Sequence, residues 1–295
     1  MTTPVIIEAA INGGTRKEQN PNVPITEDEL VADALGCLDA GASIIHHHIP
    51  ATRLSGDDAA EQYLAVWRRV LAERPDALWY PTINFGSDAE RYAHIAPMAA
   101  SGLLRLSLSD PGSVNLGYDR GGLPAGDFVY RNSFDDIAHQ LELCHEHGLG
   151  PSIAAYEPGF VRAVIAYHRA GRLPVGAMVK FYLCGDRGLT GTAFGLPVTT
   201  TALAAYVELL DGTGLPWAVS AVGDDLGRSP VIRPALDLGG HVHVGLEFYG
   251  GDRTPTNREL VTEAVELCGV AGRPVATPDQ AAERLDLPRS APLAG

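Results

Sequence analysis

Three consecutive histidines, His46, His47 and His48, close the apolar run ASIIHHHI in this chain of 295 residues. Because side chains of a strand alternate between its two faces, His46 and His48 should point the same way and His47 the opposite way. A neutral imidazole donates a nitrogen lone pair to zinc, so two imidazoles in register could form half of a metal site. Ordinary hydrogen bonds at the end of a strand are the alternative reading.

A third ligand is offered by Glu247, which directly follows the apolar run HVHVGL. A carboxylate at the end of a buried run is costly unless it is paired or bound to a metal. Two histidines and one glutamate with an open position have the composition of a catalytic zinc site. Other divalent transition metals suit the same ligands. A structural ion pair is the alternative for Glu247.

Eight apolar runs of strand length alternate along the chain with segments of helical spacing. The strands are expected at Val5–Ile11, Ala42–Ile49, Ala77–Pro81, Leu103–Leu108, Gly150–Ala155, Ala177–Leu183, Trp217–Ala221 and His241–Leu246. The helices are expected at Thr26–Leu38, Ala59–Leu71, Ala89–Ala99, Phe134–His147, Gly159–Ala170, Thr199–Leu210, Pro230–Leu238 and Asn257–Val270. Eight such pairs predict an α/β fold, a single TIM (β/α)8 barrel over residues 1–295 with a peripheral tail from about 288. An open doubly wound sheet is the alternative.

Composition narrows the class of protein. Lys and Arg number 22 against 36 Asp and Glu, a formal charge of −14, which argues against binding of nucleic acid or an anionic membrane. No apolar stretch reaches the ~18 residues that span a bilayer, and the opening MTTPVIIEAAINGG lacks the pattern of a secretory leader. The four cysteines are scattered and form no framework, so a cytoplasmic enzyme is expected.

Several motifs, in order, resemble those of the beta-keto acid cleavage enzymes. They are AAINGGTRKEQNPNVPIT, AGASIIHHHI, YEPGF, PWAVSAVG, GGHVHVGLE and GRPVATPDQA. The resemblance implies a TIM barrel that holds zinc through His46, His48 and Glu247. It also implies a Claisen-type exchange in which a beta-keto acid and an acyl-CoA, usually acetyl-CoA, become acetoacetate and a new acyl-CoA. A homo-oligomer that takes small-molecule substrates is expected on the same ground.

The chain departs from the family pattern near the expected metal. His243 stands where the family has arginine, Phe248 stands where it has aspartate, and Thr82 keeps the hydroxyl of a family serine. The resemblance implies catalytic roles for Thr82 and for Glu157 of the YE motif. His243 could serve as a general base near neutral pH, or could only hydrogen-bond to a neighbour.

Substrate binding is expected from two loops. Ser107, Ser109 and Ser113 offer hydroxyls for a substrate carboxylate, and Arg187 in the glycine-rich loop GDRGLTGTAFG could accommodate phosphates of acyl-CoA. Because Phe248 removes an acid/base group, two other functions stay open. One is a metal-dependent hydrolase or lyase on the same barrel, and the other is a non-catalytic barrel that binds a metabolite.

Overall fold

A computed structural model describes residues 3–50, 53–84, 86–87 and 90–288. Its central sheet has eight parallel strands: β1 (Ile7–Ala10), β2 (Ile44–His47), β3 (Leu78–Pro81), β4 (Leu106–Ser109), β9 (Gly150–Ala155), β10 (Met178–Cys184), β11 (Trp217–Val222) and β12 (His241–Val244). They follow the order β3-β2-β1-β12-β11-β10-β9-β4. Since β3 and β4 at the two ends of this order are in contact, the sheet curls into a nearly closed barrel. The expected TIM barrel is confirmed, and the open sheet is not formed.

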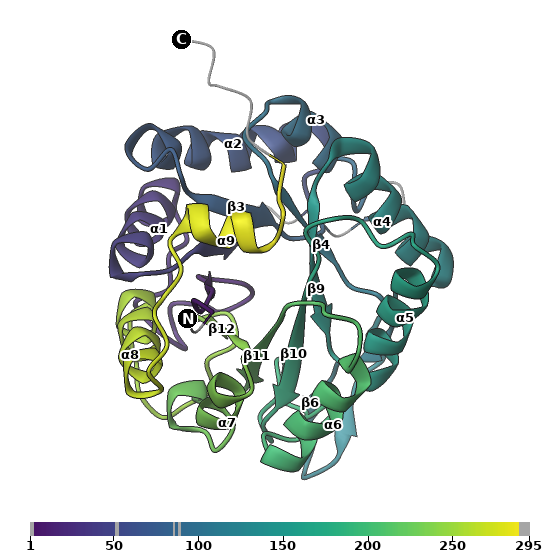
Figure 1. The fold of residues 1–295 in the computed structure, drawn as a ribbon, viewed down its shortest axis with the longest axis vertical. Helices are drawn as coiled ribbons and strands as arrows, with labels where there is room; N and C mark the ends of the chain where they lie inside the picture. The colour runs from purple at the N-terminus through teal and green to yellow at the C-terminus, as the bar shows by residue number, and fades with distance from the viewer. Residues whose placement is uncertain (1–2, 51–52, 85, 88–89, 289–295) are drawn as a thin grey trace.

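Helices surround the strands (Figure 1). They are α1 (Glu27–Ala40), α2 (Gly56–Glu73), α3 (Ile95–Ala100), α4 (Phe134–His147), α5 (Pro158–Arg169), α6 (Thr200–Leu210), α7 (Ile232–Asp237) and α8 (Asn257–Val270). Helix α1 begins close to the expected Thr26, which forms a capping box with Glu29. The Thr26 hydroxyl accepts from the Glu29 amide, and the Glu29 carboxylate accepts from the Thr26 amide. A 3-10 turn, Leu226–Arg228, precedes α7.

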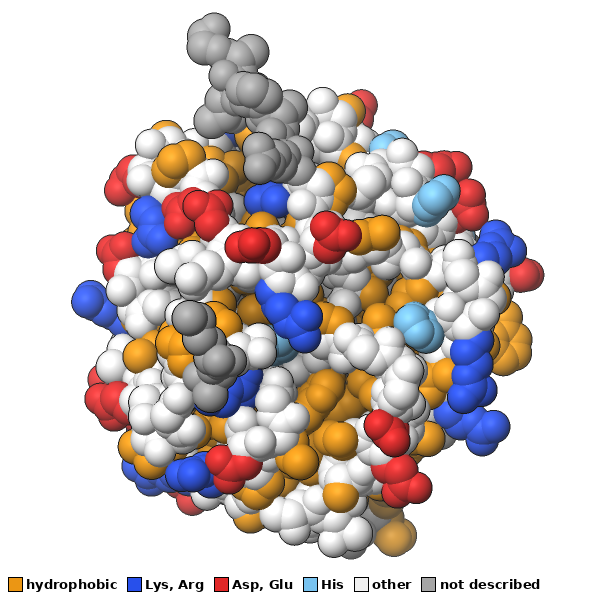
Figure 2. All heavy atoms as spheres, in the orientation of Figure 1, with side chains coloured by type: hydrophobic (Ala, Val, Ile, Leu, Met, Phe, Trp, Pro, Cys, Tyr) orange, Lys and Arg blue, Asp and Glu red, His pale blue; other side chains and the backbone are white. Residues whose placement is uncertain are grey.

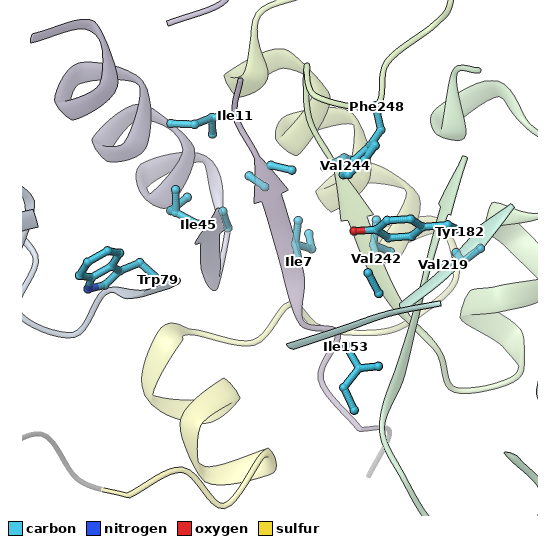
Figure 3. Close-up of a cluster of buried hydrophobic side chains, with 14 of the residues drawn as sticks. Ile7, Ile11, Ile45, Trp79, Ile153, Tyr182, Val219, Val242, Val244 and Phe248 are labelled. Atoms are coloured by element: carbon cyan, nitrogen blue, oxygen red, sulfur yellow. The ribbon is translucent and has the colours of Figure 1, made fainter. Parts of the chain in front are cut away.

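The main hydrophobic core lies between the strands and this ring of helices. Figure 3 shows Ile7, Ile45 and Trp79, which come from the neighbouring strands β1, β2 and β3 and belong to this outer core. The intervening side chains point into the barrel, as the two-residue period of a strand requires.

The inside of the barrel is layered, and the layers differ in polarity. The layer at the start of the strands is apolar and contains Ile6, Ile44, Leu78, Leu106, Met178 and Ala218. The middle layer is polar and contains Glu8, Tyr80, Ser152, Lys180 and His243. The third layer, at the carboxyl ends of the strands, contains His46, Thr82, Ala154 and Tyr182. Barrel enzymes carry their chemistry at that end.

Two features were not expected from the sequence. Helix α9 (Pro278–Arg284) lies across the barrel opening in Figure 1, where Ala281 and Leu285 join the apolar layer at the start of the strands. Between β4 and α4 the chain makes an excursion of four two-residue strands: β5 (Val114–Asn115), β6 (Tyr118–Asp119), β7 (Pro124–Ala125) and β8 (Val129–Tyr130). They form the antiparallel pairs β5–β8 and β6–β7.

Two predictions concern segments that are only partly described. The helix expected at Ala89–Ala99 is shorter, since α3 begins at Ile95, and residues 88–89 lie outside the described part of the chain. The expected peripheral tail also falls largely on residues 289–295, which are not described. The single domain stays a prediction.

Within the described ranges, no helix combines the length and the hydropathy needed to cross a lipid bilayer. On the face seen in Figure 2, acidic and basic side chains are intermingled around a central hydrophobic area.

Candidate metal centre and substrate cavity

Three side chains meet at the carboxyl end of the barrel. His46 and His48 come from the end of β2, and Glu247 comes from the turn after β12. Glu247 Oε1 lies 3.1 Å from His48 Nε2, and Glu247 Oε2 lies 3.4 Å from His46 Nε2. One ligand atom from each residue fits within a span of 4.8 Å. His47 points the other way, where its Nε2 accepts a hydrogen bond of 2.7 Å from Trp67, as the alternation predicts.

The ring of His46 is fixed in the orientation that a metal ligand needs. Its Nδ1 lies 3.1 Å from the Tyr80 carbonyl oxygen, and the ring stacks on the Tyr80 ring with centroids 4.4 Å apart. A carbonyl oxygen only accepts, so Nδ1 carries the proton and Nε2 keeps its lone pair. Burial lowers the pKa of His46 to about 3, so the imidazole is neutral.

His48 is held through its backbone by Asn12 in the loop after β1. The Asn12 carboxamide accepts from the His48 amide at 2.8 Å and donates to the His48 carbonyl at 2.9 Å. The same Asn12 oxygen accepts from the Gly13 amide. One side chain therefore ties the β1 loop to the strand end that carries two ligands.

Glu247 needs glycine beside it. Gly13 has φ +55°, and a Cβ at this position would lie 2.2 Å from Glu247 Cγ. Only a residue without a side chain fits between the β1 loop and the carboxylate. Asn257, at the start of α8, accepts from the Leu246 amide and donates to the Ile11 carbonyl, which fixes the turn that delivers Glu247.

The donor set fits a divalent cation. Without a cation, the lone pair of His46 Nε2 would face a carboxylate oxygen, and two acceptors at 3.4 Å repel each other. Burial opposes the charge on Glu247, and a bound cation would offset that cost. His48 Nε2 and Glu247 Oε2 are both buried and have no hydrogen-bond partner in the described part of the chain. These orphaned atoms are the ones that a bound metal would satisfy.

The three residues form part of the wall of a cavity of about 590 Å³. Thr82, as expected, lines it. Other parts of the wall come from the β1 loop, the excursion after β4 and the strands β9 and β10. Its aromatic members include Phe128, Tyr130, Tyr156, Tyr182 and Phe248. A cavity of this size suits a small organic acid and the reacting end of a larger carrier.

A charged cluster lies one layer deeper. Glu8 and Lys180 are fully buried, and the Lys180 ammonium lies 3.0 Å from Glu8 Oε1. Tyr80 donates its hydroxyl hydrogen to Glu8 and accepts from Lys180, and His243 Nε2 lies 3.1 Å from Glu8 Oε1. Burial opposes the charge of Glu8, but Lys180 and the hydrogen bond from Tyr80 hold its pKa far below the ordinary value. These four residues, here termed the Glu8 cluster, join β1, β3, β10 and β12.

His243 belongs to the Glu8 cluster and does not line the large cavity in the described structure. It contacts Tyr182 and Phe248, which do line it, and borders a separate void of about 20 Å³. Burial lowers the pKa of His243, while Glu8 acts in the opposite direction. Figure 3 shows Phe248 beside Val244, and its ring lies 4.9 Å from that of Tyr182. Phe248 therefore supplies an apolar wall and no acid or base.

The remaining expected residues lie outside the described wall of this cavity. Leu106 and Leu108 point into the barrel, so Ser107 and Ser109 on β4 point toward the helix layer. Ser113 is exposed and bonds the backbone of Asn132. Arg187 is exposed and bonds Gly250 and Asp252.

Glu157, also expected at the site, begins α5. Its carboxylate accepts a hydrogen bond of 3.0 Å from the Gly195 amide. It thereby holds the end of the loop 185–195 and does not line the cavity wall as described.

Two charged residues of the site were missed, although the sequence contains their signal. Glu8 and Lys180 each interrupt an apolar run, in VIIEAAI and AMVKFYLC. A charge inside a buried run needs a partner, so each one predicts the other. Asp110 received no role from the sequence, although the two-residue period of β4 places it on the inner face.

Comparison with known proteins agrees with the family resemblance of the sequence motifs. A family model described as beta-keto acid cleavage enzyme matches residues 4–287. A 3-keto-5-aminohexanoate cleavage enzyme from Acetoanaerobium sticklandii is 28% identical over 293 residues, which cover 96% of this chain and 98% of the relative. A 3-oxoadipate:acetyl-CoA acetyltransferase from Cupriavidus necator is 28% identical over 298 residues, with 98% and 96% covered.

Among solved structures, apo ObcA has a TM-score of 0.65 and 16% identity, and the match covers 90% of this chain and 66% of that one. At this identity the likeness shows the barrel fold alone. The family model, by contrast, spans nearly the whole chain, including every ligand of the candidate metal centre. The chain therefore belongs to the beta-keto acid cleavage enzyme family.

Proposed function

We propose that this protein exchanges the acyl part of a beta-keto acid with acetyl-CoA, giving acetoacetate and a new acyl-CoA. His46, His48 and Glu247 would hold a divalent metal, zinc in the first instance. The observation that carries the proposal is the convergence of these three donors within 4.8 Å on the wall of a 590 Å³ cavity. Membership of the family and the names of the relatives support the acyl-transfer chemistry.

The exchange can be written so that every bond is accounted for. A proton leaves C2 of the keto acid, and C2 forms a bond to the acetyl carbonyl carbon as the thioester C–S bond breaks. The released CoA thiolate adds to the C3 keto carbon, and the C2–C3 bond then breaks. The electron pair remains on C2, which takes up a proton, so acetoacetate and the new acyl-CoA are released. When bound, a divalent cation supplies Lewis acidity that stabilises negative charge on the keto oxygen.

The residues of the chain orient and enclose the reactants. The Thr82 hydroxyl lies on the cavity wall, where it can donate to the keto acid carboxylate. Tyr182 and Phe248 form an apolar wall that excludes water from the reacting carbons. Glu157 holds the loop 185–195, in which Arg187 is the proposed contact for acyl-CoA.

His243 has two candidate roles, and one substitution separates them. Its imidazole is available as a base because burial keeps it neutral, and the neighbouring Glu8 would stabilise the protonated ring. If His243 is the base, His243→Phe lowers kcat and removes the corresponding limb of the pH profile. If His243 only contacts its neighbours in the Glu8 cluster, the folded variant keeps the kcat and the pH profile of the wild type, and only the free energy of unfolding falls.

The proposed function is tested by supplying acetyl-CoA and a panel of beta-keto acids to protein of measured metal content. We expect acetoacetate and the new acyl-CoA in equal amounts, with no product when acetyl-CoA is omitted. The loss of Asp at position 248 favours one rival, a metal-dependent hydrolase or lyase. A hydrolase would consume the keto acid even when acetyl-CoA is omitted. The reaction without acetyl-CoA therefore distinguishes a hydrolase from the proposed acyl exchange.

Compartment and assembly are part of the same proposal. All four cysteines are buried free thiols, which suits a reducing cytoplasm. The family resemblance supports a homo-oligomer. Light scattering of the purified protein measures its mass directly, and a mass near 31.2 kDa would contradict the oligomer.

A further inference from the structure

The proposed exchange begins with the loss of a proton from C2 of the keto acid, so the cavity needs a base on its wall. Two carboxylates line the wall as described, those of Glu247 and Asp110. The oxygens of Glu247 face the imidazoles of His48 and His46, which assigns this carboxylate to the candidate metal centre. Asp110 is therefore the carboxylate that stays available for proton transfer.

The hydrogen bonds of Asp110 leave one of its oxygens free. Asp110 directly follows β4 and is only 2% exposed. Tyr130 donates its hydroxyl hydrogen to Asp110 Oδ2, and the Asp110 amide donates to Gln140 at 2.7 Å. The other carboxylate oxygen, Oδ1, is buried and accepts no hydrogen bond from any described residue. One oxygen is thus fixed by a donor while the other keeps a free lone pair, as a general base requires.

The acidity of Asp110 agrees with this geometry. Burial raises the pKa of its carboxyl to about 6, against the hydrogen bond from Tyr130. At neutral pH the carboxylate is therefore mostly ionised. A base whose pKa lies near the working pH combines the right protonation state with a useful affinity for the proton.

Groups from several elements act on the Asp110 carboxyl. Lys180 on β10 and Arg91 before α3 lower its pKa, whereas Glu247 after β12 raises it. Both cations are bonded to other groups in the described structure. The titratable surroundings in the described ranges also include phenol hydroxyls, those of Tyr92, Tyr130 and Tyr156.

The position of Asp110 in the barrel directs it toward the reacting carbons. In the strand order, β4 and β12 are four places apart around a barrel of eight, so Asp110 and Glu247 lie on opposite sides of the mouth. Thr82, the proposed contact for the keto acid carboxylate, follows β3, which is in contact with β4. C2 lies between the keto carbon and the carboxylate carbon. A keto acid held at the metal ligands and at Thr82 would therefore present C2 to the space that Asp110 faces.

His243, the other candidate base, is less well placed. It does not line the large cavity in the described structure and contacts Tyr182 and Phe248, which do line it. With Asp110 as the base, His243 keeps only its contacts within the Glu8 cluster.

We propose that Asp110, oriented by Tyr130, is the general base that takes the proton from C2 of the beta-keto acid and returns it to C2 of acetoacetate. The electron pair of the C2–H bond forms the bond from C2 to the acetyl carbonyl carbon as the thioester C–S bond breaks. When the C2–C3 bond breaks, the pair left on C2 takes the proton back from the Asp110 carboxyl. This assignment rests on the proposed function for the placement of the keto acid.

The proton transfer can be measured without the acyl exchange. Acetoacetate is incubated with the zinc-loaded protein in deuterium oxide without acetyl-CoA, and NMR follows the replacement of its C2 hydrogens above the rate in buffer alone. We expect the wild type to catalyse this exchange. Asp110→Asn removes the base but keeps an oxygen for Tyr130, and should slow the exchange by at least about 100-fold. Its metal content, and its binding of acetoacetate in calorimetry, should match the wild type.

The pH dependence of the exchange provides a readout that a structural role would not move. Because only the ionised carboxylate accepts a proton, the wild-type rate should fall as the pH drops through about 6. Tyr130→Phe keeps the carboxylate but removes a hydrogen bond that stabilises its charge, so this acidic limb should move to higher pH. His243→Phe should leave the limb in place. So should Asp135→Asn, which alters an exposed carboxylate in the first turn of α4.

Failure of the base assignment and failure of the proposed function look different. The assignment is overturned if the wild type shows no exchange above the buffer rate, or if Asp110→Asn exchanges C2 as fast as the wild type. An acidic limb that His243→Phe removes, or that Tyr130→Phe leaves unmoved, also overturns it. Tyr130→Phe thus tests the assignment even if Asp110→Asn folds poorly. Exchange that Asp110→Asn abolishes, in a protein that forms no acetoacetate from other keto acids and acetyl-CoA, supports the base and refutes the acyl exchange.

Discussion

Two polar regions lie one above the other inside the barrel, and they differ in how their charges are satisfied. In the Glu8 cluster, the Glu8 carboxylate accepts hydrogen bonds from Lys180 and Tyr80, and only the ring of His243, 3.1 Å from Glu8 Oε1, has nitrogens without a hydrogen-bond partner among the described residues. In the candidate metal centre above it, His48 Nε2 and Glu247 Oε2 are buried without hydrogen-bond partners among the described residues. A buried charge that has a counter-ion and hydrogen bonds stabilises its surroundings, whereas a buried carboxylate without a cation is suited to a ligand.

The two regions are also mechanically linked. Tyr80 contributes its hydroxyl to the Glu8 cluster, while its ring and carbonyl oxygen orient His46. The Glu8 cluster therefore helps to hold His46 in its orientation at the candidate metal centre. Variants that disturb only one of the two regions test whether the lower region mainly stabilises the fold and the upper one mainly binds a ligand.

The largest effect on stability is expected from breaking the lower cluster. Lys180→Met leaves Glu8 buried without its cation and should lower the free energy of unfolding by about 3–5 kcal/mol. The double variant Glu8→Gln/Lys180→Met removes both charges and should recover most of that loss. Urea denaturation at neutral pH measures both values.

A surface pair provides the control for that experiment. Lys17 also pairs with a carboxylate, that of Glu29 at 2.6 Å, but both side chains are 39% exposed. Lys17→Met should cost no more than about 1 kcal/mol. If Lys180→Met costs as little as Lys17→Met, the lower cluster does not have the stabilising role assigned to it.

A smaller effect, confined to the upper region, is expected from Asn12→Ala. The substitution frees the His48 backbone and should weaken metal binding by about 10–100-fold, as for other residues that orient ligands. Competition with a chelator of known affinity measures the change. Asn22→Ala, in the same loop but bonded to the Thr254 carbonyl, should bind metal like the wild type. Equal metal affinities in the two variants would show that Asn12 does not support metal binding.

Asp33 is an intermediate case, since its buried carboxyl has an amide partner but forms no ion pair within 4.0 Å among the described residues. Burial raises its pKa to about 7, against the hydrogen bond of 2.6 Å from Asn257. A raised carboxyl pKa favours the folded state at low pH, and that advantage is lost as the pH rises through about 7.

Relative to Asp33→Asn, the wild type should therefore lose stability between about pH 4 and pH 7. The full shift corresponds to about 4 kcal/mol, and partial exposure reduces this value. Thermal unfolding of both proteins across this range provides the measurement. Parallel pH curves for the two proteins would show that Asp33 titrates normally.

Most of the fold could be predicted because each barrel strand carries a strong local signal. Phe134–His147 and Asn257–Val270 were predicted with the bounds that the structure gives them. The short strands β5 to β8 could not be predicted, since two-residue pairs leave no periodic pattern. Helix α9 has a local signal that was overlooked, a capping box of Thr277 and Gln280, but its position beneath the barrel is a tertiary effect.

The convergence of His46, His48 and Glu247 could be predicted because these residues stand at the ends of recognisable apolar runs. The substrate wall was harder: Ser107 and Ser109 were chosen by residue type, although the two-residue period of β4 favours Leu108 and Asp110 on the inner face. Asn12 and Gly13 act through backbone contacts with residues 36 and 234 positions away, which no local pattern contains.

The metal content and the activity of Glu247→Gln, measured on the same sample beside the wild type, test the proposed site most directly. Glutamine keeps the size of the side chain but removes the charge that would hold the metal. We predict about one metal per chain and acetyl-CoA-dependent acetoacetate in the wild type. In the variant we predict no bound metal and a loss of activity of at least about 1,000-fold. A variant that keeps its metal or its acetoacetate production would contradict the assignment of His46, His48 and Glu247.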